Sequence, residues 1–99
     1  MNDKMNSVLA VCWAAAQGDI NELRRLVASG VDLNVGDYDN RTGIHLAASE
    51  GKLEAVKFFI AKGVGLSPKD RFGGTPLIDA KRGDHKQVVA LLEKHGVKE

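Results

Sequence analysis

The sequence predicts an all-α fold, a solenoid of three stacked helix-turn-helix units with short β-hairpin-like fingers between them. Three observations carry this prediction. Similar stretches begin 33 residues apart at Leu9, Thr42 and Thr75. Each stretch holds two apolar patterns at helical spacing, which predicts a pair of helices. Each then closes on a glycine, which adopts the left-handed backbone that ends a helix more easily than other residues do; these are Gly30, Gly63 and Gly96.

The first helix of the second and third units is expected to begin after a threonine. The side chains of Thr42 and Thr75 can accept hydrogen bonds from N–H groups of the first turn. Pro76 then takes the first helical position, where its missing N–H costs no hydrogen bond. Gly43 stands there in the second unit, and we expect it to weaken that helix start by up to about 1 kcal/mol. Small side chains should let the first helices approach closely, namely Ala14, Ala15, Ala47, Ala48 and Ala80.

The second helix of each unit combines an apolar stripe with a charged face. A single helix pair cannot bury such a stripe, so the units must stack, and about three repeats is near the minimum for stability. Gly18 and Gly51 turn the first helix into the second, whereas Asp84 stands at the third corner. The stripes are Leu23, Leu26 and Val27, then Val56, Phe59 and Ile60, then Val88, Val89, Leu91 and Leu92.

Length and composition predict one domain of 99 residues, divided into a polar N-terminal segment (1–8) and a repeat domain (9–99) with repeats at about 9–41, 42–74 and 75–97. The net charge of +1 gives no reason to expect a nucleic-acid or membrane partner. Cys12 is the single cysteine, so no intrachain disulfide can form. With no apolar signal core, residence in the cytoplasm is expected, with the nucleus as the alternative.

Candidate catalytic and metal-binding groups favour structural roles. His45 lies three residues after Thr42 and is expected to hydrogen-bond within that turn. Cys12 lies on an apolar helix and is expected to be a buried thiol. No Cys/His spacing matches a zinc site and no glycine-rich phosphate loop follows a strand, so neither a metal nor a cofactor is expected. The chain is therefore not expected to be an enzyme.

A period of 33 with a T-P-L-H-x-A-like opening resembles ankyrin repeats, and the resemblance covers about residues 9–97. "DYDNRT" and "DRFGGT" precede the second and third repeats, as the fingers of that family do. The family implies a binding module that recognises proteins through its concave side, formed by the finger tips and the outer faces of the first helices.

Two stretches resemble a narrower group. "DYDNRTGIHLAASEGKLEAVKFFI" and "SPKDRFGGTP" are similar to the ankyrin segment that follows the catalytic domain of animal-type glutaminases. The D-R-aromatic-G-x-T-P-L piece is also similar to plant kinases with N-terminal ankyrin repeats. The glutaminase resemblance implies an alternative function, a regulatory or assembly domain of a glutaminase-like enzyme.

The sequence thus predicts non-catalytic protein–protein recognition, with a protein partner that it does not identify. The alternative expectation for part of this surface is a structural role and not partner binding. Arg41 and Arg71 would then hold the fingers together through Asp37, Asp39 and Asp70, with Phe72 packed on a neighbouring loop. The predicted partner-binding residues are Tyr38, Asp39, Arg41, Ser49, Glu50, Arg71, Phe72, Lys81 and Arg82.

Trp13 and its surroundings raise a second possibility. We expect Trp13 to pack against the N-terminal segment, with partner contact as the alternative. The chain is expected to be a monomer. If it self-associates, the N-terminal repeat is the expected contact because it carries Val8, Leu9, Val11 and Trp13.

Overall fold

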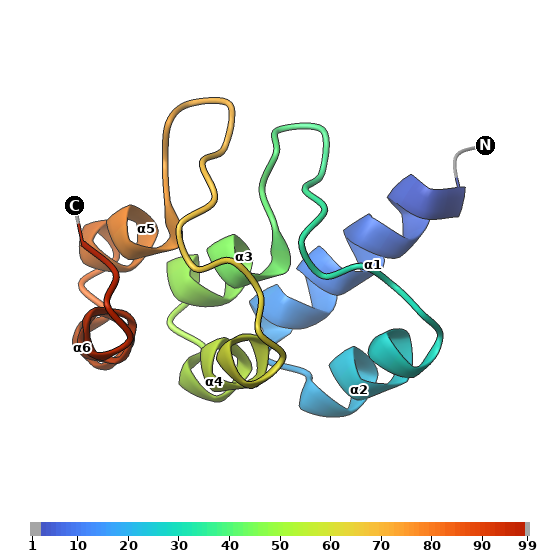
Figure 1. The fold of residues 1–99 in the computed structure, drawn as a ribbon, viewed down its shortest axis with the longest axis horizontal. Helices are drawn as coiled ribbons and strands as arrows, with labels where there is room; N and C mark the ends of the chain where they lie inside the picture. The colour runs from blue at the N-terminus through green and yellow to red at the C-terminus, as the bar shows by residue number, and fades with distance from the viewer. Residues whose placement is uncertain (1–2, 99) are drawn as a thin grey trace.

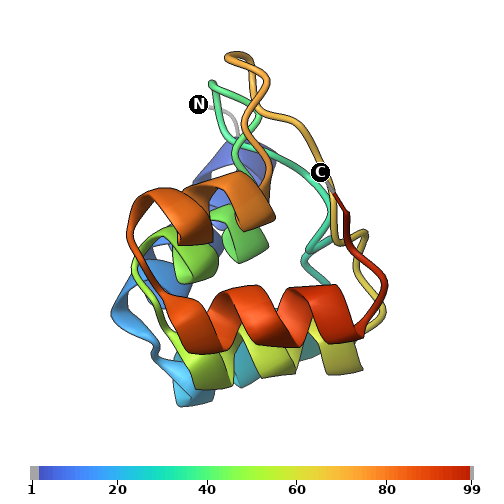
Figure 2. The ribbon, with the colours of Figure 1, turned by 90° about the vertical axis from the view of Figure 1, so that its left-hand side faces the viewer.

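The computed structural model describes residues 3–98 and confirms the all-α repeat fold (Figure 1). Within these residues the chain forms helices and loops, without a β-strand. The first helices of the three pairs lie side by side in one layer and the second helices in another, and two loops rise beyond the first layer (Figure 2). The helices are α1 (Asp3–Gln17), α2 (Ile20–Ala28), α3 (Gly43–Ser49), α4 (Leu53–Ala61), α5 (Pro76–Arg82) and α6 (Lys86–Lys94).

The helix starts of the second and third repeats follow the predicted capping. Thr42 and Thr75 are the N-caps of α3 and α5, both with extended backbone, and Pro76 is the first residue of α5. The Ile78 N–H donates to the Thr75 hydroxyl at 3.2 Å. The threonines therefore fix where each first helix begins.

α1 is longer than α3 and α5 because it begins at Asp3. By the 33-residue period, the described part of the segment 1–8 is in register with the loops that precede α3 and α5, yet it is helical. Val8 and Val11 are each 3% exposed. Two of the four apolar residues expected to make the N-terminal repeat adhesive are therefore inside the fold.

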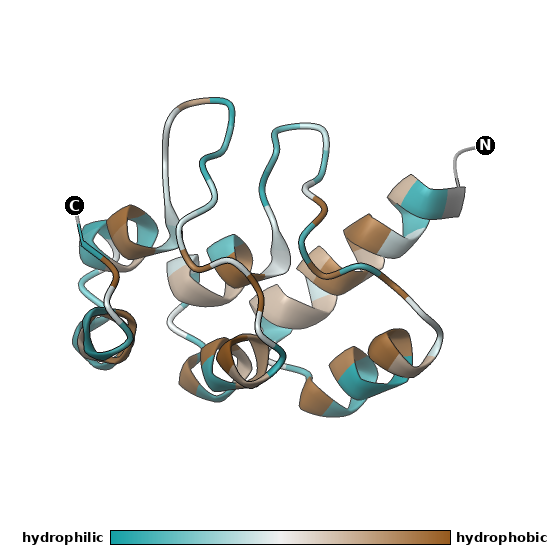
Figure 3. Ribbon diagram, in the orientation of Figure 1, coloured by the Kyte–Doolittle hydropathy of each residue, from teal (hydrophilic) through white to brown (hydrophobic). Residues whose placement is uncertain are grey.

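The core runs the length of the stack and is mainly aliphatic. The largest fully buried side chains include Leu23, Ile44, Phe59, Leu77 and Leu92, which come from all three repeats. Hydrophobic residues alternate with hydrophilic ones on the helices, whereas the two raised loops are mostly hydrophilic or neutral (Figure 3). Apolar surface is thus buried between successive repeats, as the period predicts.

The structure corrects the expectation that Gly43 merely weakens a helix. Gly43 is buried, and a Cβ atom placed there would lie 2.5 Å from Phe59 Cζ and 2.9 Å from Val11 Cγ1. Phe59 fills the space that a larger residue at position 43 would occupy. Glycine is therefore required by packing in the second repeat.

The helix corners of the three repeats differ in backbone strain. Gly18 and Gly51 have φ values of 70° and 68°, and Asp84 has φ 58° at the same place in the third repeat. A left-handed conformation is less favourable for aspartate than for glycine. Replacing Asp84 with glycine is expected to raise the free energy of unfolding by about 0.5–1 kcal/mol, measured by urea denaturation.

The Asp84→Ala variant separates backbone strain from the loss of a charge. Alanine also lacks the carboxylate but retains the unfavourable backbone conformation. If both variants gain the same stability, the charge and not the backbone is the cause.

Candidate functional site

Two fingers project from the layer of first helices, finger one at 34–41 and finger two at 67–74. An aspartate in each finger accepts the backbone N–H groups of the residues two and four positions later. Both finger tips therefore have the same turn. The next-to-last residue of each finger has a positive φ, 60° at Asn40 and 81° at Gly73. The bonds run from Asp39 and Arg41 to Asp37 Oδ1 at 2.9 and 3.0 Å, and from Phe72 and Gly74 to Asp70 Oδ1 at 2.9 and 2.8 Å.

The two fingers are also bonded to each other. The Arg71 backbone N–H donates to the Asp39 carbonyl at 2.9 Å, and Arg71 Nη1 lies 3.2 Å from Asp39 Oδ1. Nearer the helices, the Gly65 N–H donates to Asn34 Oδ1 at 2.9 Å. The tips therefore form one connected unit. Because they are already ordered, less conformational entropy is lost when a partner binds.

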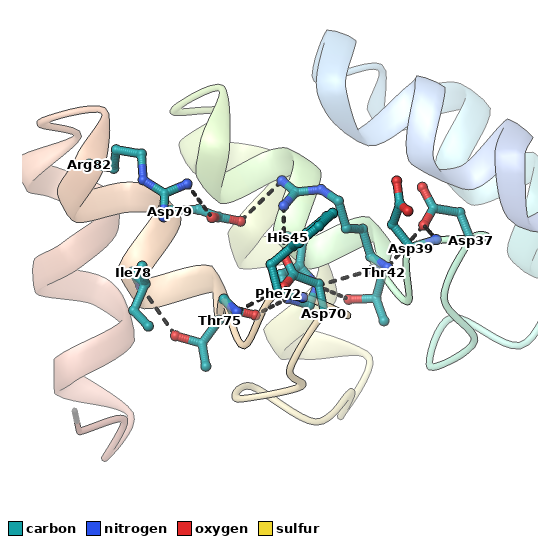
Figure 4. A network of polar contacts seen from close by, with 12 residues as sticks. Asp37, Asp39, Thr42, His45, Asp70, Phe72, Thr75, Ile78, Asp79 and Arg82 are labelled. Carbon is teal, nitrogen blue, oxygen red and sulfur yellow. Dashed lines mark hydrogen bonds and ion pairs between the residues drawn. The ribbon is translucent and has the colours of Figure 1, made fainter.

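Arg41 connects finger one to the third repeat. Its Nη1 lies 2.9 Å from Asp70 Oδ2 and its Nη2 lies 3.1 Å from Asp79 Oδ2, on α5. The carboxylates are 3% and 2% exposed, and the Arg41 side chain is 22% exposed. Figure 4 shows the carboxyls of Asp70 and Asp79 and the nearby Arg82, which reaches Asp79 Oδ1 at 3.7 Å. These contacts fit the finger-holding role for Arg41; the Asp79 contact was not expected from the sequence.

Asp70 is held as a carboxylate by this arrangement. Burial by itself raises the pKa of Asp70, but the N–H groups of Gly74 and Phe72 and the charge of Arg41 outweigh it, so the pKa lies below the ordinary 3.8. Asp70 is therefore ionised at neutral pH and retains its pairing with Arg41.

His45 has the structural role that its position predicts. Its Nδ1 accepts the Thr42 N–H at 3.0 Å, which leaves the proton on Nε2 to donate to the Gly74 carbonyl at 2.9 Å. The ring is fully buried. His85 makes a similar link, with its Nε2 2.9 Å from the Ser49 carbonyl. His45 thus ties the start of α3 to the end of finger two, and His85 joins the third repeat to the second.

Cys12 is a buried thiol that hydrogen-bonds to backbone. Its S–H donates to the Arg41 carbonyl at 3.5 Å, and the residue is 7% exposed. Burial, aided by the negative charge of Asp37, raises the pKa of Cys12 to about 11. A thiol with so little thiolate is a poor nucleophile. Within residues 3–98, no three His, Cys, Asp or Glu side chains gather so that they could hold a metal ion.

The finger tips and α1 expose large aromatic side chains. Tyr38 and Phe72 are each 75% exposed, and the Arg71 guanidinium lies over the Phe72 ring, 5.2 Å from its centroid. Trp13 is 70% exposed, so the expectation that it packs against the N-terminal segment is wrong. The 33-residue register gives no signal of this exposure, because it aligns Trp13 with Leu46, which is half-buried, and with Asp79, which is buried.

The other predicted binding residues are spread over α3, α5 and the corners. Ser49, partly buried at the end of α3, uses its carbonyl to hold His85. Glu50 follows it and is exposed. Lys81 borders a shallow hollow with Val89 and Ala90 of α6, at the C-terminal end of the stack. By register Lys81 occupies the place of the buried Ala48. Of these residues, Arg82 lies closest to the Arg41 network.

Comparison with known proteins agrees with this architecture. A family model described as ankyrin repeats in three copies matches residues 11–98. The liver isoform of mitochondrial glutaminase from Rattus norvegicus is 44% identical over 90 residues, which are 90% of this chain and 15% of the relative. Serine/threonine-protein kinase 12 from Arabidopsis thaliana is 34% identical over 96 residues, 97% of this chain and 21% of the kinase. Both resemblances expected from the fingers are thus found.

A solved structure shares the fold closely. It is a chain from the complex of the predatory endopeptidase Bd0816 of Bdellovibrio bacteriovorus with the immunity protein Bd3460. The TM-score is 0.86 at 37% identity, over 90% of this chain and 47% of that one. This chain therefore spans less than half of that structural neighbour and about a fifth or less of the two relatives. No helix within residues 3–98 has the length and apolarity needed to cross a membrane.

Proposed function

The chain belongs to the ankyrin repeat family, a type of protein-interaction module, and from this premise we propose that it is a non-catalytic module that binds a protein partner through its concave surface. The observation that carries the proposal is the pair of exposed aromatic side chains, Tyr38 and Phe72, on two fingers that are bonded together. Aromatic residues and arginine dominate the energetics of protein interfaces. A preordered surface of this kind loses little entropy on binding.

The proposed contact residues are those predicted from the sequence, but they are expected to contribute unequally to binding. Tyr38, Phe72 and Arg71 are the proposed main contacts because they are exposed at the tips. Arg41 is proposed to act mainly by holding the surface in shape, since it is committed to Asp70 and Asp79. The proposed rim consists of Asp39, Ser49, Glu50, Lys81 and Arg82. We propose cytoplasmic residence, in line with the single reduced cysteine.

The Tyr38→Ala/Phe72→Ala double variant tests this proposal. We expect capture of a partner by the immobilised chain from an extract of its native cells to fall at least tenfold, because two hot-spot side chains are removed. Helical circular dichroism should be unchanged, since both side chains point into solvent. The measurement is quantitative mass spectrometry of captured proteins, which also identifies the partner.

The control carries alanine at Lys57 and Arg24, which are exposed on the second helices. It should capture as much partner as the wild type. Equal capture by the finger variant and the wild type would exclude the finger tips as the binding surface.

A second candidate function is a regulatory or assembly role in a glutaminase-like enzyme, which the 44% identity to rat glutaminase over 90 residues favours. The reading frame around the first codon tests it directly. A glutaminase catalytic domain encoded in the same reading frame would support this role. A reading frame that encodes no such domain would favour the independent module.

A further inference from the structure

The surface made by the first helices changes character along the stack. At its N-terminal end, Trp13 and Leu9 lie one turn apart on α1 and are 70% and 41% exposed. One repeat further, the position in register with Trp13 is Leu46, which is half-buried. In the third repeat the same position is Asp79, which is charged and buried. The apolar surface therefore ends after the second repeat.

Towards the C-terminal end two arginines are exposed, although buried carboxylates lie near them and Asp84 and Glu93 are exposed beside Lys81. The Arg82 side chain is 73% exposed and that of Arg71 is 61% exposed. Asp70 and Asp79 are nearly inaccessible and already bonded to Arg41. Arg82 meets Asp79 only at 3.7 Å, so most of its five N–H donors face solvent. Lys69 in finger two and Lys81 on α5 are exposed as well.

We propose that this surface binds an extended segment of the partner with an aromatic or aliphatic side chain at one end and carboxylates at the other. The apolar side chain contacts Trp13 and Leu9, and the carboxylates bond mainly to Arg82, because Arg71 already pairs with Asp39 at 3.2 Å and can add only a second contact. Charge complementarity selects the acidic end, because a guanidinium with free donors pairs with carboxylates in a bidentate manner. The inference rests on the proposed function and adds the partner's chemistry and its alignment along the stack.

The dimensions set the spacing within the segment. Packed helices lie 8–10 Å apart, so Trp13 and Arg82, two repeats apart, are separated by about 20 Å. An extended chain rises about 3.3 Å per residue, so about six residues separate the apolar and acidic groups. The molecule is 36 Å along its longest axis, which leaves room for such a segment.

Selection from a phage library of random 12-residue peptides tests this inference. The wild-type chain should enrich peptides in which an aromatic or aliphatic residue lies five to seven positions from Asp or Glu. The Trp13→Ala variant should lose the apolar preference and keep the acidic one. The Arg82→Glu variant should lose the acidic preference at least tenfold, and Arg82→Gln is used if circular dichroism shows that the glutamate variant is unfolded.

Arg25→Glu is the matched control, because Arg25 is exposed on α2, in the other layer, and pairs with a single glutamate. Enrichment that lacks the two-part pattern, or that responds to Arg25→Glu as strongly as to Arg82→Glu, overturns the inference. A library that enriches nothing also overturns it. In each case the proposed function is judged separately, by partner capture with the Tyr38→Ala/Phe72→Ala variant, which uses no peptide.

Discussion

Replacing Arg41 with leucine is expected to lower the free energy of unfolding by about 3 kcal/mol, at the low end of the range for breaking a buried ion pair, because Arg41 is itself partly exposed. The variant leaves Asp70 and Asp79 buried without their main counter-charge. Asp70 keeps two backbone N–H donors, whereas the ion pair left to Asp79 is the long one with Arg82 at 3.7 Å. Urea denaturation followed by circular dichroism measures the change.

Two further variants define the cause. Arg25→Leu removes an arginine whose ion pair is exposed, and the unfolding midpoint should barely move. Adding Asp79→Leu to Arg41→Leu should recover part of the lost stability, because the stranded carboxylate is then gone. If the double variant is no more stable than Arg41→Leu, an uncompensated charge is not the cause.

The same network predicts a dependence on acid. The folded pKa of Asp70 is lowered, so its contribution to stability is full above the unfolded value of about 3.8 and is lost as pH falls through the folded value. Unfolding free energy should therefore decline as pH falls below about 4. In Arg41→Leu one cause of the lowered pKa is absent while the unfolded pKa is unchanged, so the decline attributable to Asp70 should be smaller and should end at a higher pH, measured by urea titrations at several pH values.

Replacing Gly43 with alanine is expected to destabilise the protein by about 2 kcal/mol through overpacking. The new Cβ would lie 2.5 Å from Phe59 Cζ, and that ring is fully buried. The other repeats carry a larger residue in register with Gly43 and a smaller one in register with Phe59, namely Ala10 with Leu26 and Pro76 with Leu92. Glycine and phenylalanine in the second repeat therefore compensate for each other.

A double-mutant cycle measures this coupling. In the Phe59→Leu background, Gly43→Ala should cost less than in the wild type, with the approach to Val11 Cγ1 remaining, and Gly43→Pro should be better tolerated at the first helical position. We expect a coupling free energy of at least about 1 kcal/mol between positions 43 and 59, since the side chains would be in contact. Additive effects of the two substitutions would show that Phe59 does not determine the residue at position 43.

Local features of the fold could be predicted from the sequence because each depends on one residue and its neighbours. The 33-residue period located the helix pairs, and Thr42 and Thr75 cap the helices as their positions predict. Gly18 and Gly51 have positive φ at the corners. The glycines that close the repeats, Gly30, Gly63 and Gly96, also have positive φ. These assignments needed no knowledge of contacts between repeats.

Features that depend on contacts between repeats could not be predicted in the same way. The Arg41–Asp79 pair joins residues 38 positions apart, and no period or motif links them. The requirement for Gly43 arises from Phe59 on α4 and, to a lesser extent, from Val11 on α1. Trp13 was expected to pack against the N-terminal segment, and the 33-residue register does not identify it as exposed, because it aligns Trp13 with the half-buried Leu46 and the buried Asp79. The binding surface is therefore the part that sequence patterns specify least.

Mapping of amide and indole N–H chemical shifts in the ¹⁵N-labelled chain tests the central claim most directly, with a captured partner that binds the wild type and not Tyr38→Ala/Phe72→Ala. The account predicts that the largest changes occur at the finger tips, along α1, α3 and α5, and at the Trp13 indole N–H, the single indole of the chain. Changes concentrated on α2, α4 and α6, with the tips and Trp13 unaffected, would contradict it.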